Sequence, residues 1–127
     1  MFTTEQLENL RRFYRTGASR SCTFRIQQLK KLRQMLLDHE KDIYDALQAD
    51  LHKSREEVWV TEIGMVLAEI NQALRHLKAW MEPVRVRTNL ANLPSSSFVM
   101  KEPLGVVLII GPWNYPVQLL LNPLVGA

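Results

Sequence analysis

Residues 103–127 read PLGVVLIIGPWNYPVQLLLNPLVGA and contain no charged side chain. Leu104 to Ile110 form a continuous apolar, β-branched run, which is typical of a parallel strand buried on both faces. The neighbours of such a strand must come from elsewhere. Exposing an apolar surface of this size to water is unfavourable, so we expect a partner or further polypeptide to cover it.

The same segment has about the length of a transmembrane helix. Its prolines would remove backbone hydrogen bonds, and its side-chain amides would find no partners in hydrocarbon. These residues are Pro112, Asn114, Pro116, Gln118, Asn122 and Pro123. The sequence therefore does not favour a membrane span.

A proline-clamped hexapeptide, residues 111–116, follows the predicted strand. Its place at the carboxyl end of a parallel strand is where open α/β sheets bind ligands. The prolines stiffen the loop, and between them Trp113 offers a flat surface, Asn114 an amide donor and Tyr115 an amphipathic ring. A rigidly held amide is suited to stabilising negative charge on a substrate oxygen. Alternatively, Asn114 caps the next helix, Pro116 lies in its first turn and Trp113 is ordinary core; the spacing alone leaves both interpretations open.

Upstream of this segment, apolar residues at steps of three and four predict helices. Caps support the boundaries: Thr3 and Gln6 form a capping box, Gly17 is a left-handed terminator, and Ser54 is an N-cap. An apolar stripe from Ile63 to Met81 marks the longest helix. Such a stripe most often packs against other elements of the fold. The first two predicted helices span residues 3–16 and 22–37. After a bend near residues 39–40, helical periodicity continues to about residue 51. The last predicted helix spans residues 55–82 and ends at Pro83. VRVR in the connector 83–97 predicts an exposed edge strand, and residues 98–100 predict another short strand.

Composition restricts the function. The chain has 127 residues, 46% of them hydrophobic and 23% charged, and a net charge of +3. One domain at most is expected. Basic residues are interleaved with acidic ones, so nucleic acid is not an expected partner.

The single cysteine and the histidines also restrict the chemistry. We expect Cys22 to be a structural or surface thiol, and His39, His52 and His76 to face solvent. The spacing of these residues fits neither a metal site nor a catalytic triad, so we expect no metal. The amino terminus lacks a secretory signal, so we expect a cytoplasmic protein.

The stretch EPLGVVLIIGPWNYPVQLLLNPLVGA at 102–127 resembles the signature of the aldehyde dehydrogenase superfamily, specifically its class 3 family. ALQADLHKS at 46–54, TEI at 61–63, EI at 69–70 and LKAWM at 77–81 are also similar to that family, in the same order. The resemblance implies an α/β protein: amino-terminal helices plus the first strand of a Rossmann-like aldehyde dehydrogenase fold, truncated. Residues 1–82 would be the helical part of the cofactor-binding domain, 83–101 a connecting and oligomerisation β segment, and 102–127 the first Rossmann-type strand with its loop.

In that family a cysteine thiolate attacks the aldehyde, hydride passes to NAD or NADP, and water hydrolyses the thioester. The resemblance therefore implies that Asn114 stabilises the oxyanion of the thiohemiacetal. Ile110, Pro112 and Trp113 would border the nicotinamide half of the cofactor. Tyr115 and Met65 would line the substrate channel, where Met65 in place of an aromatic suggests a flexible aliphatic entrance.

The family's catalytic cysteine, general-base glutamate, cofactor-binding lysine and glycine-rich turn lie downstream of the matched region. We therefore expect an incomplete, inert portion of an enzyme that acts on aldehydes and forms a homodimer. Any membrane association would come only from a missing carboxyl-terminal segment. Two alternatives remain open: a non-catalytic helical interaction module that binds a partner through its apolar tail, and a related acyl reductase.

Overall fold

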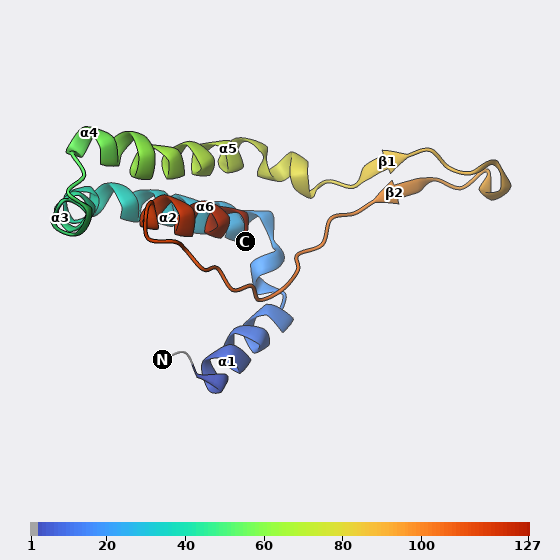
Figure 1. Ribbon diagram of the computed structural model, residues 1–127. Helices are drawn as coiled ribbons and strands as arrows, with labels where there is room; N and C mark the ends of the chain where they lie inside the picture. Colours follow the sequence, from blue (N-terminus) through green and yellow to red (C-terminus); the bar gives the residue numbers. More distant parts are fainter. Residues whose placement is uncertain (1–2) are drawn as a thin grey trace.

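A computed structural model describes residues 3–127 and shows a helical body from which a two-stranded hairpin projects (Figure 1). The helices are α1 (Thr4–Arg15), α2 (Cys22–Asp38), α3 (Glu40–Leu51), α4 (Arg55–Val58), α5 (Gly64–Met81) and α6 (Pro116–Gly126). The strands are β1 (Val84–Val86) and β2 (Ser97–Val99). A π-helical turn, η2 (Trp59–Ile63), joins α4 to α5, and short 3₁₀ turns lie at Ala18–Arg20 (η1) and Leu90–Asn92 (η3).

The helix boundaries follow the capping signals of the sequence. Thr3 and Gln6 form the predicted capping box at α1, and Gly17 has a left-handed φ of 74° after its end. The Ser54 side chain accepts a hydrogen bond from the Glu57 N–H at the start of α4. The predicted bend between the second and third helices lies at His39, which ends α2 and precedes α3.

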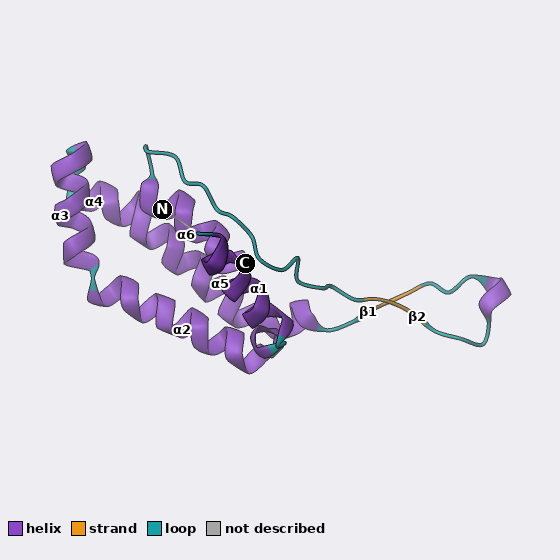
Figure 2. Ribbon diagram, turned by 90° about the horizontal axis from the view of Figure 1, so that it is seen from below, coloured by secondary structure: helices purple, strands orange, loops and turns teal. Residues whose placement is uncertain are grey.

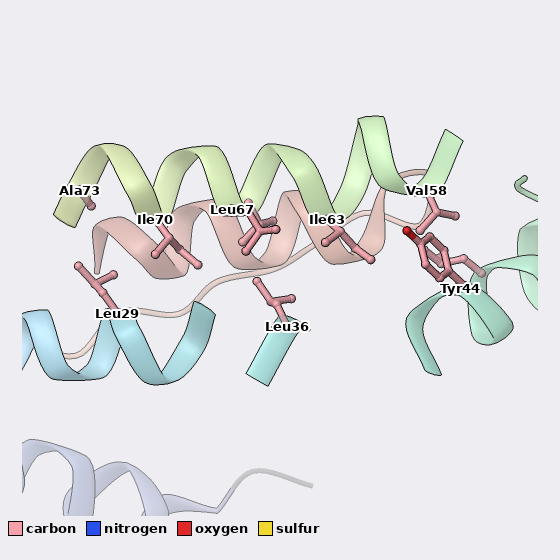
Figure 3. Close-up of a cluster of buried hydrophobic side chains, with 10 residues drawn as sticks. Leu29, Leu36, Tyr44, Val58, Ile63, Leu67, Ile70 and Ala73 are labelled. Carbon is pink, nitrogen blue, oxygen red and sulfur yellow. The ribbon is translucent and has the colours of Figure 1, made fainter. Parts of the chain in front are cut away.

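The core lies where α2 and α6 pack against α5. The predicted stripe supplies its centre, since Ile63, Leu67 and Ile70 are buried. They face Leu29 and Leu36 of α2 (Figure 3). Burial of this stripe, and not helix propensity alone, therefore holds the long helix in place.

The long helix departs from the prediction at one point, the π-helical turn η2. The Gly64 N–H donates to the Trp59 carbonyl, five residues back. Val58 and Ile63, also five residues apart, are both 0% exposed. The extra residue in this turn thus places Val58 and Ile63 on the same buried face of the helix.

Gly64 is required by this turn. A Cβ atom added there would lie 2.7 Å from the Trp59 carbonyl oxygen. We expect Gly64→Ala to lower the free energy of unfolding by about 1–3 kcal/mol, the usual cost of overpacking. Urea denaturation of the chain measures this change, with Gly126→Ala as the control, because a Cβ there meets nothing within 4 Å. Equal or greater stability of Gly64→Ala would show that the turn does not depend on glycine.

Both predicted strands are present and pair with each other. Val84 lies opposite Val99 and Val86 opposite Ser97 in an antiparallel register. Val84, Phe98 and Val99 remain more than half exposed. An isolated two-stranded hairpin is marginally stable in water, so this one is suited to contact another surface.

The predicted strand at Leu104–Ile110 is not formed in the described residues. This segment returns alongside the helical body as an irregular connection (Figure 2). A parallel strand requires hydrogen-bonded neighbours, and residues 3–127 supply none for it. Leu104, Leu108 and Ile110 are accordingly 95%, 84% and 81% exposed. Among the described residues, no helix combines the length and apolarity that a membrane span requires.

Candidate functional site

The backbone of the hexapeptide loop is held by a buried ion pair. Lys53, in the turn between α3 and α4, places its Nζ 2.7 Å from Glu62 Oε1. The same Nζ donates to the Asn114 carbonyl oxygen at 2.7 Å. The side chains of Lys53 and Glu62 are 8% and 0% exposed. The position of the Asn114 peptide is therefore fixed from the interior of the protein.

Glu62 also caps the helix that follows the loop. Its Oε2 accepts hydrogen bonds from the backbone N–H groups of Val117 at 3.1 Å and Gln118 at 2.9 Å. Because these N–H groups belong to the first turn of α6, they have no partner within the helix, and the helix dipole favours a negative charge beside them. Pro116, the first residue of this helix, has no N–H to satisfy.

In this structure Asn114 is not the N-cap of α6, which is the alternative role that the sequence left open. Tyr115 is the N-cap residue of α6, and no side chain at that position makes a cap hydrogen bond. Pro116 does lie in the first turn, as that alternative predicted. Trp113 is 89% exposed, so it is not ordinary core in this chain. Asn114 is an exposed residue, and its backbone carbonyl accepts a hydrogen bond from Lys53.

Tyr115 adds a further contact to the loop. The Lys53 ammonium lies 4.0 Å from the centroid of its ring, a cation–π distance. Lys53 thus holds two successive residues of the loop, Asn114 through its carbonyl and Tyr115 through its ring. Such restraint leaves little reorganisation for any ligand that the Asn114 amide would bind.

The other predicted site residues fall into two groups. Ile110, Pro112 and Trp113 precede Asn114 in the chain and are exposed in this structure. Met65 lies on α5, 48% exposed, outside the Lys53–Glu62 contacts.

Lys53 and Glu62 are the site residues that sequence reasoning did not identify. One signal was present: Glu62 is a charged residue next to Ile63 and four residues from both Val58 and Val66, all three of which are apolar and buried. A carboxylate at such a position needs a buried partner. The identity of that partner depends on the fold, because the carboxylate contacts residues 53, 117 and 118.

The histidines and the cysteine take no part in the Lys53–Glu62 contacts described above. His39, His52 and His76 are exposed, as predicted. Cys22 is a free, partly exposed thiol at the first residue of α2. No cluster of His, Cys, Asp or Glu side chains suited to a metal ion occurs within residues 3–127.

Comparison with known proteins identifies the family. The sequence model of the Aldehyde dehydrogenase family matches residues 7–127. The chain belongs to the aldehyde dehydrogenase family. Among class 3 relatives, mouse aldehyde dehydrogenase family 3 member B1 is 47% identical over 123 residues, which are 97% of this chain and 26% of the relative. The Staphylococcus aureus 4,4'-diaponeurosporen-aldehyde dehydrogenase is 44% identical over 91% of this chain and 25% of its own length.

A solved aldehyde dehydrogenase has the same arrangement of elements. The substrate-bound state of Staphylococcus aureus AldH superposes with a TM-score of 0.94 at 42% identity, covering 99% of this chain and 28% of that one. The class 3 resemblance and the α/β aldehyde dehydrogenase fold inferred from sequence are thereby confirmed. The chain spans about a quarter of the length of the curated relatives that it matches.

Proposed function

We propose that this chain supplies the amino-terminal part of an NAD(P)-dependent enzyme that oxidises aldehydes to carboxylates, and that Asn114 donates a hydrogen bond to the oxyanion formed during the reaction. The supporting observation is that Asn114 is exposed and lies on a backbone held by Lys53 and Glu62. Pre-organised donors of this kind stabilise charge that develops in the transition state. Family membership supports an aldehyde oxygen as the group on which that charge would develop.

The residues before Asn114 fit the expected cofactor. Ile110 and Trp113, 81% and 89% exposed, offer apolar and aromatic surface for a flat nicotinamide ring. Pro112 lies between them and keeps the backbone stiff. We assign these three residues to the nicotinamide half of NAD or NADP, which would accept hydride when bound.

Tyr115 and Met65 are the proposed substrate-channel residues. Tyr115 is restrained by Lys53, so its ring would form a fixed wall. The Met65 thioether is half-exposed and flexible, which suits aliphatic aldehydes. The exposed β1–β2 hairpin supports a homodimer contact in the complete enzyme. A cytoplasmic location remains part of this proposal.

A chimeric enzyme tests the proposed function. Residues 1–127 of this chain replace the matching quarter of mouse aldehyde dehydrogenase family 3 member B1. With a medium-chain aldehyde and NAD+ or NADP+, we expect NAD(P)H and carboxylate to form in equal amounts. Loss of this activity in a folded chimera would contradict the proposal.

A non-catalytic interaction module would give no aldehyde oxidation in the same experiment. An acyl reductase would differ from a dehydrogenase in residues downstream of the matched region, so that alternative is tested with the protein that contains this chain: it would consume NAD(P)H with an acyl thioester and would form no carboxylate from the aldehyde. Family membership favours neither alternative.

A further inference from the structure

We infer that Lys53 and Glu62 are positioning residues for the Asn114 carboxamide, and that the π-helical turn η2 brings Glu62 to this task. The inference rests on the proposed oxyanion role of Asn114. It extends that role to side chains that would touch neither aldehyde nor cofactor.

Every polar atom of the Glu62 side chain is engaged with the loop region. Oε1 accepts from Lys53, and Oε2 accepts from the N–H groups of Val117 and Gln118. A buried ion pair is weak evidence for stability, because removing two charges from water is costly. Here the pair joins three parts of the chain: the α3–α4 turn, η2 and the start of α6. Its contacts define where the loop lies.

Lys53 transmits this position to Asn114 directly. Its Nζ lies 2.7 Å from the Asn114 carbonyl oxygen and 4.0 Å from the Tyr115 ring centroid. Fixing the carbonyl fixes the Asn114 Cα, and with it the base of the side chain. A misplacement of a catalytic group by about 1 Å can cost about 10²-fold in rate. The ammonium therefore affects the reaction through the loop.

The π-helical turn explains why Glu62 is buried beside an apolar stripe. Ile63 packs in the core while Glu62, the preceding residue, points to the loop; both are 0% exposed. Gly64 permits the turn, because a Cβ there would meet the Trp59 carbonyl oxygen at 2.7 Å. π-Bulges occur frequently at functional sites, which agrees with this assignment.

Two variants of the chimeric enzyme separate positioning from folding. Lys53→Met keeps the aliphatic stem and removes the donor, and Glu62→Gln keeps the shape but turns an N–H group toward Val117 or Lys53. We expect each to lower kcat about 10- to 100-fold with little change in the Kd for NAD+. Hydrogen–deuterium exchange should rise in peptides covering residues 112–119. Lys41→Met is the matched control, because Lys41 pairs with Asp45 at the exposed surface.

A double-mutant cycle decides whether Lys53 acts through Asn114. If it does, adding Lys53→Met to Asn114→Ala should lower kcat by less than about 3-fold more, because the positioned group is already gone. Fully multiplicative losses, or parental kcat in both Lys53→Met and Glu62→Gln, would overturn the inference.

If the folded parent does not oxidise aldehydes, the proposed function fails. In that case unchanged exchange at residues 112–119 in both variants would overturn the positioning of the loop, and increased exchange would support it.

Discussion

Glu62→Leu is expected to lower the free energy of unfolding of this chain by about 3–5 kcal/mol, the usual cost of breaking a buried ion pair from one side. The substitution leaves the Lys53 ammonium, 8% exposed, without its carboxylate. It also removes the acceptor for the first-turn N–H groups of α6 at Val117 and Gln118. Urea denaturation followed by circular dichroism measures the change.

The second substitution in this test is Lys53→Met in the Glu62→Leu background. Because it removes the uncompensated charge, we expect part of the lost stability to return. Asp45→Ala is the control, since its partner Lys41 lies at the exposed surface and no measurable change is expected. If Glu62→Leu were as stable as the parent, the buried pair would not hold the loop.

Most helices could be predicted because their signals are local. The capping box at Thr3 and Gln6 and the left-handed Gly17 act within one turn of α1. The stripe through Ile63, Leu67 and Ile70 records the buried face of a long helix at steps of three and four. Alternation in VRVR similarly predicted β1, which pairs with β2.

The π-helical turn could not be predicted in the same way. The apolar stripe was traced from Ile63 onward, so Val58, five residues earlier, carried no signal in a pattern of threes and fours. The contacts of Glu62 are also invisible to local periodicity, because they reach Lys53 and α6. The prediction that Asn114 belongs to a rigid loop was made from its prolines alone, and the structure adds a second restraint from this distant pair.

The predicted strand at Leu104–Ile110 shows the limit of composition. A β-branched run indicates that a segment can join a sheet, while the ladder itself depends on neighbouring strands. Within residues 3–127 the segment has no such neighbour, and Leu108 remains 84% exposed. The family relatives, of which this chain spans about a quarter, have the additional length from which strands would come.

Asn114→Ala in the chimeric enzyme is expected to lower kcat by about 10² to 10³, the usual loss when one oxyanion donor is removed. Asn114 is an exposed residue and is not the N-cap of α6, so removal of its carboxamide should leave the fold intact. The Kd for NAD+ should also stay close to the parental value. Asn9→Ala, at an exposed position of α1, is the matched control and should keep the parental kcat.

Single-turnover formation of NADH, at saturating aldehyde and NAD+, examines the Asn114 donor without interference from product release. A rate for Asn114→Ala about 10² to 10³ below that of the parent, with unchanged thermal stability, is the expected result if the carboxamide stabilises the oxyanion. A single-turnover rate equal to that of the parent would show that Asn114 has no part in the chemical step.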